Sequence, residues 1–530
     1  MKDLAALLLP AETRLRFLEE VKAVLSPEQF QRVRAVFEGS AELLGIVEAK
    51  KLSMSRLCSR VFGPKTEKGH RVCGGSPPEN PQDRKRRRGH GRVSHRRYTG
   101  ARRIPVPHPH RKPGDTCPDC RRGKLRRQKE PATTVTLRAQ PPVAALIHER
   151  ERLRCDTCGK VFTAPIPAEA AQEKFDPTVG VMVGLLRYGS GMPFHRLERL
   201  QRSVGVPLPA SVQWEQALRV ARCLEPVVEH LLQLGAQSAV FYNDDTAMRI
   251  AGVRQEIQAE DKPKRTGIFT TGIVCEGLQG ADGLSIRILR TGRHHAGENL
   301  GRVLDRRQKD QPPPLQMCDA LERNEPKEHP TELCHCTVHA RRQFVDICTH
   351  FPEECRRVVE SLGHVYRVDA ECRKEKLGPQ ERLRRHQAQS GPVMETLRQE
   401  LQEAVDQKKI EPNSALGGAV AYVLDRWSTL TLFLKVPGAP LDNNQTERLL
   451  KNAILHRKNS LHYKTQRGAD VGDTFMTVIE TCRANGANPF DYILAVVRNS
   501  DAVRATPGSW MPWNYPHHPE APPASTPAPP

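Results

Sequence analysis

Three acidic residues, far apart in the chain, could together hold metal ions. Two apolar runs of strand-like composition end in acid, one at Asp244 and the other at Asp319. Further on, the polar segment 441–448 carries Glu447 into an apolar-periodic helix. Carboxylates at two strand ends and on one helix can hold a pair of Mg²⁺ (or Mn²⁺) ions, which take oxygen ligands and leave positions open for phosphate. The chemistry indicated is phosphodiester cleavage and transfer.

A second acid, Asp245, directly follows Asp244. Side chains alternate between the two faces of a strand, so only one of these neighbours can face the other acids. We expect Asp244 to be the metal ligand, with Asp245 as the alternative first ligand.

Four cysteines form two Cys-x-x-Cys pairs with 34 residues between them. Each pair makes a tight turn that aims two sulfurs at one point, and two such turns complete a tetrahedral shell. The spacing predicts one structural Zn²⁺ held by Cys117, Cys120, Cys155 and Cys158. Strand-like runs at 133–137 and 143–147 lie between the pairs, as in a zinc ribbon. A closed four-cysteine site should fold the module rather than catalyse; unmetallated thiols are the alternative.

The positive charge of the chain is concentrated in one segment. The sequence has 82 Lys and Arg against 61 Asp and Glu, a net charge of +21, which favours a polyanionic partner. Residues 84–114 contain twelve Lys or Arg and no acid. Such a block binds DNA by displacing counterions, without reading sequence; a solvated linker is the alternative. Its first members are Arg84, Lys85, Arg86, Arg87 and Arg88.

Short motifs between residues 62 and 492 occur in the order found in one known family. They are FGPKTEK at 62–68, the two Cys-x-x-Cys pairs, NDDT at 243–246, CTVHARRQF at 336–344, DNNQTER at 442–448, HRKN at 456–459 and NGANPFDY at 485–492. The chain resembles transposases of the insertion-sequence-66 (IS66) family. It departs from the family where Asp245 replaces the usual Glu and where Ala320 and Leu321 follow Asp319 in place of Gly-Tyr or Ala-Tyr.

The resemblance implies a ribonuclease-H-like catalytic domain with an Asp-Asp-Glu triad at Asp244, Asp319 and Glu447. It implies an enzyme that binds double-stranded DNA at element ends and at the target, cleaves the ends and joins their 3′-hydroxyls to target DNA at one two-metal site. A homo-oligomer is expected, with accessory proteins as candidate partners. The basic residues expected to contact DNA near the acids are Arg341, Arg342, Lys451, Arg457 and Lys458.

Two regions leave alternatives open. Residues 194–214 fit a helix-turn-helix that reads DNA, with Ser211 capping the second helix, or simple helical packing, with Trp214 in the core in either case. Cys336 and His339 form half of a zinc pattern, to be completed by Cys334 or His335, although a structural or phosphate-positioning role is favoured. A polar cluster for which a solvated loop is the default comprises His294, His295, Glu298 and Asn299.

The fold class expected is α/β, a mixed sheet with helices that carries an α-helical insertion. Strand-like runs lie at 239–246, 266–274, 284–289 and 315–319, and a helix should begin at Gly378 and Pro379. The predicted boundaries are an N-terminal helical region at 1–70, a basic arm at 71–113, the zinc module at 114–165, a helical, candidate DNA-binding region at 166–235, the catalytic domain at 236–345 and 437–500, its helical insertion at 346–436, and a Pro-rich tail at 501–530.

Two other functions fit parts of the pattern. A nuclease or resolvase of the same fold would cut without joining, and a non-catalytic DNA-binding regulator is disfavoured because all three acids are present. No apolar run approaches the roughly 18 residues of a membrane span, and we recognise no signal peptide. We expect a soluble, cytoplasmic protein of the bacterial nucleoid with reduced thiols and no membrane partner.

Overall fold

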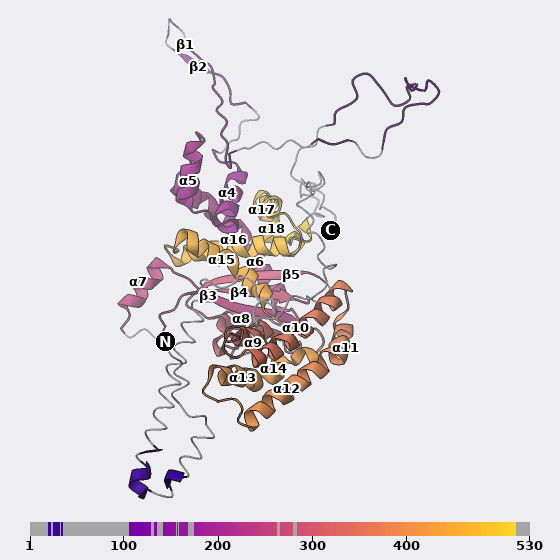
Figure 1. The fold of residues 1–530 in the computed structure, drawn as a ribbon. Helices are drawn as coiled ribbons and strands as arrows, with labels where there is room; N and C mark the ends of the chain where they lie inside the picture. Colours follow the sequence, from indigo (N-terminus) through magenta and orange to yellow (C-terminus); the bar gives the residue numbers. More distant parts are fainter. Residues whose placement is uncertain are drawn as a thin grey trace, which may run out of the picture. The chain divides into compact units, whose positions relative to one another are not determined.

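The computed structural model describes residues 20–22, 25–31, 33–34, 105–128, 132–134, 141–154, 156, 158, 160–167, 174–261, 265–278 and 283–515. The chain divides into two compact units built from segments far apart in the sequence (Figure 1). Unit 1 comprises Met1–Asn80, Leu315–Glu322 and Thr331–Asn443, and unit 2 comprises Pro81–Pro314, Arg323–Pro330 and Asn444–Pro530. The motif at 62–68, the basic cluster at 84–88 and the chain end at 521–530 lie outside the described residues.

Unit 2 is built on an antiparallel meander of three strands. β3 (Val240–Ala247), β4 (Phe269–Glu276) and β5 (Ser285–Gly292) lie in the order β5-β4-β3. The three runs expected as strands are therefore strands, with shifted ends. β3 continues to Ala247, so Asp244 lies inside the strand and not at its end as expected.

Helices cover both faces of this sheet. α15 (Asn444–Ser460) packs against β3 and β4, and α16 (Gln466–Ala484) packs against β5. α8 (Ala296–Leu304) contacts β3 and β4, while α6 (Ala210–Ala236) contacts β4 and β5.

Two glycines identify the face that each helix covers. A Cβ added to Gly272 of β4 would lie 3.2 Å from Leu450 of α15, and one added to Gly235 of α6 would lie 3.3 Å from the Sγ atom of Cys275. Gly272 and Cys275 are three positions apart on β4, so they point to opposite faces. α15 and α6 therefore pack on opposite sides of the sheet.

Side chains of α16 close the outer edge of β5. Backbone N–H groups of alternate strand residues donate to polar side chains spaced one helical turn apart. The pairs are Thr291 with Asp473 at 2.6 Å, Leu289 with Thr477 at 3.0 Å, Arg287 with Thr481 at 3.1 Å and Ser285 with Asn485 at 3.1 Å. Two strand residues span about 6.7 Å and four helical residues about 6.0 Å, so the two spacings match. The helix thus satisfies N–H groups that would otherwise need another strand.

Short helices precede the sheet in the chain. They are α4 (Pro177–Gly184), the π-helical turn η4 (Leu185–Gly189) and α5 (Phe194–Ser203). α6 begins after Pro209, and the N–H of Ala210 donates to Glu198 of α5 at 3.3 Å. The expected cap by Ser211 is wrong, because Glu198 accepts the bond at this helix start.

The cysteine-rich module contains one short hairpin. β1 (Arg152–Arg154) and β2 (Val161–Thr163) pair antiparallel around the second Cys-x-x-Cys pair. The strand expected at 143–147 is wrong, since these residues have no regular structure. Leu146 and Ile147 are 89% and 86% exposed, so no neighbouring surface rewards an extended conformation there. Of the run at 133–137, only residues 133 and 134 are described, and they are not in a strand.

Unit 1 combines a parallel strand pair with helices. β6 (Leu315–Cys318) and β7 (Glu332–His335) pair in parallel. The helices are α9 (Thr337–Val345), α10 (Pro352–Lys374), α11 (Pro379–Gln389), α12 (Gly391–Asp406), α13 (Ala415–Asp425), α14 (Trp427–Leu430) and the 3₁₀ turn η6 (Leu432–Leu434). The expected helix start at Gly378 is confirmed, because the N–H of Gly378 donates to Glu381 at 3.2 Å.

The chain remains folded past residue 500. The remaining elements are η5 (Glu322–Asn324), α7 (Ala251–Ala259), α17 (Pro489–Arg498), α18 (Ser500–Ala505) and η7 (Pro507–Trp510). Trp510 is completely buried, and its carbonyl accepts a hydrogen bond from Tyr492 at 2.8 Å. No helix among the described residues is long and apolar enough to cross a membrane.

Candidate active site

Asp244 and Asp245 point to opposite faces of the unit 2 sheet. Directly paired residues of antiparallel strands share a face, so Asp244 lies on the side of Gly272 and Asp245 on the side of Thr271. Gly272 faces α15, whereas Thr271 accepts a hydrogen bond from Asn299 of α8 at 2.8 Å. The carboxylate of Asp244 is therefore directed to the α15 side of the sheet.

Glu447 lies in the first turn of α15 and is half-buried. It precedes Leu450 by three residues, so the two side chains share a helix face, and Leu450 is the residue that covers Gly272. Two acids of the expected triad thus lie on the same side of the unit 2 sheet. The helix N-terminus adds positive potential there, which favours bound anions.

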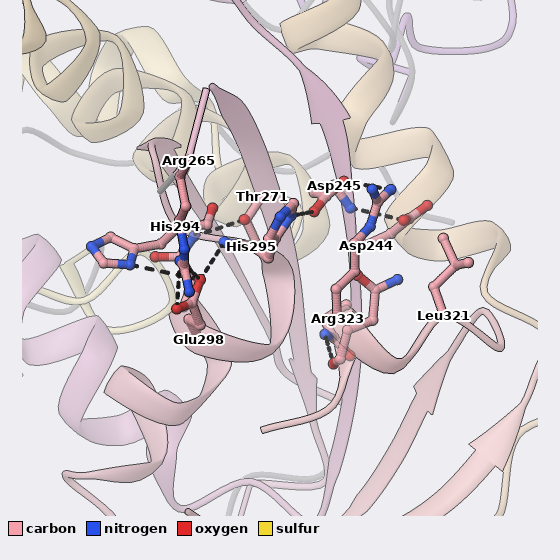
Figure 2. A network of polar contacts seen from close by, with 12 residues as sticks. Asp244, Asp245, Arg265, Thr271, His294, His295, Glu298, Leu321 and Arg323 are labelled. Carbon is pink, nitrogen blue, oxygen red and sulfur yellow. Dashed lines mark hydrogen bonds and ion pairs between the residues drawn. The ribbon is translucent and has the colours of Figure 1, made fainter. Parts of the chain in front are cut away.

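The carboxylate of Asp245 is held in a polar network on the other face, drawn in Figure 2. One oxygen lies 3.0 Å from Nδ1 of His295, and the other lies 3.3 Å from a guanidinium nitrogen of Arg323. The Asp245 side chain is 1% exposed. Because both of its oxygens have protein partners, this carboxylate stabilises the fold and is poorly placed to bind metal.

The start of α8 supports this network and corrects another expectation. The N–H of His295 donates to Glu298 at 2.9 Å, and Arg265 forms an ion pair with Glu298 at 2.6 Å. Burial opposes ionisation of Glu298, but these two donors still hold its pKa below the usual value. The solvated loop expected here is wrong, because His295 caps α8 and Asn299 is buried against the sheet.

Asp319 belongs to unit 1, where it directly follows β6. It is half-buried, and its Oδ1 accepts the N–H of Leu321 at 3.3 Å. A side chain that bonds its own backbone two residues on forms an Asx turn. Asp319 therefore occupies the strand-end position expected from the sequence.

Cys336 anchors the segment that leads into α15. Its sulfur lies 3.4 Å from the N–H of Asn443, and the hydroxyl of Thr337 donates to the carbonyl of Leu441 at 2.8 Å. Burial raises the pKa of the Cys336 thiol to about 11, so it stays protonated and is a weak metal ligand. These contacts favour the structural role over the half-site for zinc.

Among the basic residues expected to contact DNA, Arg457 has a partner in the fold. Its guanidinium lies 3.3 Å from the hydroxyl of Thr246 and also donates to the carbonyl of Ala247, so it links α15 to the end of β3. Lys451 and Lys458 on the same helix are exposed. In unit 1, Arg341 is half-buried and Arg342 exposed on α9. Their contacts with DNA stay predictions.

The first Cys-x-x-Cys pair forms a tight turn. The N–H of Cys117 donates to the carbonyl of Gly123 at 2.8 Å, and the N–H of Gly123 lies 3.5 Å from the sulfur of Cys120. The N–H groups of Arg122 and Gly123 hold the pKa of Cys120 below its usual value, which favours the thiolate. Cys158 is exposed in the turn between β1 and β2, while Cys155 lies outside the described residues.

Metal-binding capacity follows from donor chemistry at these positions. In the part of the chain that the structure describes, no cluster of three or more His, Cys, Asp or Glu is arranged as a metal site. Carboxylate oxygens such as those of Asp244 and Glu447 are nevertheless the ligands that Mg²⁺ prefers, and the thiol pair at Cys117 and Cys120 suits Zn²⁺.

Comparison with known proteins identifies the family. Residues 174–471, more than half of the chain, match the model of the IS66 family of transposases. The chain belongs to this family. It is 25% identical over 391 residues to the uncharacterized protein y4jD of Sinorhizobium fredii, an alignment that covers 69% of this chain and 71% of y4jD. It is also 25% identical over 427 residues to the uncharacterized protein y4hP of that organism, with 76% and 74% covered.

The matched region of this IS66 family member includes all three candidate acids and begins after the cysteine-rich module. Sequence reasoning missed Arg323 and Asn324, which tie down the strand that carries Asp244. Asn324 accepts a bond at 2.7 Å from the buried amide of Asn243, and Arg323 pairs with Asp245. No local pattern marks either residue, because each is about 80 positions away from its partner.

Proposed function

We propose that this protein cleaves the DNA ends of its insertion sequence and joins their 3′-hydroxyls to target DNA. Asp244, Asp319 and Glu447 are the metal-holding acids in this proposal. The observation that carries it is the division of labour between two neighbours: Asp244 shares a side of the sheet with Glu447, whereas Asp245 is engaged by the protein on the other side.

We also propose a ribonuclease-H-like fold for the catalytic domain. Three antiparallel strands, β3 to β5, are followed in the chain by the parallel pair β6 and β7. One acid lies on the first antiparallel strand, one follows the first parallel strand and one lies on a later helix. This order supports the assignment of the triad.

In the proposed reaction the chain supplies hard oxygen ligands and positive charge. Bound Mg²⁺ would supply Lewis-acid activation of the scissile phosphate and of the attacking water or 3′-hydroxyl. Lys451, exposed one turn after Glu447, can contact a phosphate of the same DNA. Asp245, His295 and Arg323 keep β3 in register, so that Asp244 stays on the α15 side.

The cysteines and the basic arm supply binding functions in this proposal. Cys117, Cys120, Cys155 and Cys158 hold a structural Zn²⁺, and the turn at Cys120 that favours a thiolate supports this assignment. The arm supplies affinity without sequence preference. Replacing all five basic residues at 84–88 with Ala should flatten the slope of log K against log salt by about 0.9 for each phosphate that the arm no longer neutralises; an unchanged slope would make the arm a linker.

Cleavage and joining are tested on the element that encodes the chain. Labelled duplexes carrying its ends are incubated with the protein and Mg²⁺, and pre-nicked ends are offered with a target plasmid to measure joining alone. We expect both activities, and expect Asp244→Asn, Asp319→Asn and Glu447→Gln to lose them while DNA binding persists. Cleavage without joining would favour a nuclease or resolvase, and binding without cleavage would favour a regulator. Full cleavage by all three variants would refute the assignment of the acids.

A further inference from the structure

Unit 2 contains a pocket of about 770 Å³ whose lining includes none of the three candidate acids. The η4 turn, α5, the first turns of α6 and the segment 460–468 enclose it. Four of its lining side chains are aromatic: Tyr188, Phe194, Trp214 and Tyr463. Trp214, expected in the core, is instead half-buried in the wall of this pocket. The volume is typical of a site for a small organic ligand.

Stacked rings support the aromatic wall from beneath. Tyr188 stacks on Phe475 with centroids 5.1 Å apart, and Tyr463 stacks on His456 at 4.4 Å. Burial, followed by the charge of Arg187, lowers the pKa of His456 to about 3, so its ring is neutral. The wall is therefore held by a packed, uncharged aromatic stack.

A buried cation lies against these rings. Arg187 is 8% exposed, and its guanidinium carbon is 4.8 Å from the ring centroid of Phe194 and 5.8 Å from that of Tyr188. Its guanidinium donates to the hydroxyl of Ser460, while its Nε has no hydrogen-bond partner among the described residues. No carboxylate in the described part of the chain pairs with it. A buried guanidinium without a counter-ion lowers its energy by binding an anion.

The remaining charged side chains of the pocket have the same sign. Lys464 and Arg467 are exposed in the lining, as are His195 and His462, and none of the described lining residues is Asp or Glu. The pocket therefore offers flat apolar surfaces together with positive charge. A ligand that matches both is a planar ring system that carries an anion.

We propose that this pocket receives a single unpaired nucleotide of DNA, with its base stacked on the aromatic wall and its phosphate facing Arg187, Lys464 and Arg467. The proposal rests on the proposed function, because it takes DNA as the partner. Every base has a π-face, so aromatic walls with cations bind unpaired nucleotides of any sequence. An acidic peptide would match the cations but would leave the aromatic walls without a partner, so the nucleotide is the better fit.

The test compares two DNA probes that differ by one feature. One is a 30-base-pair duplex with a six-nucleotide unpaired arm whose first base is 2-aminopurine, and the other is the same duplex without the arm. We expect the full-length protein to prefer the arm and to quench the 2-aminopurine fluorescence by stacking. Trp214→Ala should reduce the preference by about 5- to 100-fold, and Trp214→Phe should restore most of it.

Charge is tested with a matched pair of double variants. Lys464→Ala with Arg467→Ala should flatten the salt dependence of arm binding by about 1.4 in the log–log slope, which corresponds to two phosphate contacts on a single strand. Lys309→Ala with Arg504→Ala removes the same charge from exposed positions outside the pocket and should not change the preference. Unfolding curves of each variant verify that the fold is retained.

Three results would overturn the proposal: no preference of the wild-type protein for the arm, an unquenched arm base, or equal losses in the two double variants. Competition of the arm by an acidic peptide at equal concentration would assign the pocket to a protein ligand instead. Loss of binding to both probes by the wild-type protein is a different outcome, since it refutes the proposed action on DNA. The duplex without the arm separates these two failures.

Discussion

The two neighbouring aspartates of β3 should respond oppositely to the same isosteric change. Asp244→Asn keeps the oxygen that accepts the N–H of Asp245 at 2.8 Å but removes the charge that binds metal. Asp245→Asn keeps the shape of a side chain that is 1% exposed, but it presents an amide to His295 or Arg323 in place of a carboxylate oxygen. The first change should abolish activity, and the second should lower stability.

The size of each effect follows from the surroundings. A hydrogen bond to a charged group contributes about 1.5–3 kcal/mol, and removing one partner of a fully buried ion pair costs about 3–5 kcal/mol. Arg323 is 45% exposed and His295 is 25% exposed, so water compensates part of the loss. We expect Asp245→Asn to cost about 1–3 kcal/mol. Loss of a metal ligand removes several kcal/mol of transition-state stabilisation, or about a thousandfold in rate.

Two assays on the same protein preparations separate these effects. Urea unfolding, followed by fluorescence, reports the stability of each variant, and cleavage of labelled element ends below the unfolding range reports activity. Asp244→Asn should unfold within about 1 kcal/mol of the wild-type protein and show no cleavage. Asp245→Asn should unfold at lower urea and retain most of its cleavage rate at low temperature.

The opposite pattern would refute the reasoning. If Asp245→Asn is inactive at unchanged stability while Asp244→Asn cleaves DNA, the register of the first ligand is wrong by one residue. If both variants are active, neither aspartate holds an essential metal ion.

Three further predictions concern the α16 contact and the cysteine module. Thr477→Val keeps the shape of a buried side chain but leaves the N–H of Leu289 without its acceptor, so it should destabilise by about 1–3 kcal/mol; the exposed Thr474→Val serves as the control. Burial raises the pKa of Asp473 to about 7, so its contribution to stability is complete below about pH 4 and is lost as pH rises through 7. Asp473→Asn should remove this slope from urea midpoints measured between about pH 4 and 8. Metal analysis should find one Zn²⁺ per wild-type chain and none in Cys120→Ser, whereas zinc-free wild-type protein from metal-replete, reducing conditions would contradict the four-cysteine site.

Local patterns in the sequence were sufficient for several elements. The apolar runs that contain Asp244 and precede Asp319 are strands, and Glu447 lies in the first turn of a helix. The helix start at Gly378 also follows from neighbouring residues, because Pro379 and Glu381 act on the first turn itself. In each of these cases the interactions that decide the structure join residues a few positions apart.

Other features depended on packing between distant segments. The short strand β7, Glu332–His335, has little apolar alternation and is stabilised by its parallel pairing with β6. The run at 143–147 has good strand composition but no partner strand. Strand composition measures fit to a neighbouring surface, so it fails where that surface is absent or cannot be seen in the sequence.

The sequence by itself determined which residue types are available: paired acids, thiol pairs, a concentration of positive charge and the order of motifs. Tertiary structure decided which neighbour each acid faces, because the face of Asp244 is defined only by its pairing with Gly272 and by α15. It also moved Trp214 from an expected core position to the wall of a pocket beside Arg187. Both outcomes come from contacts between segments far apart in the chain, which local periodicity does not encode.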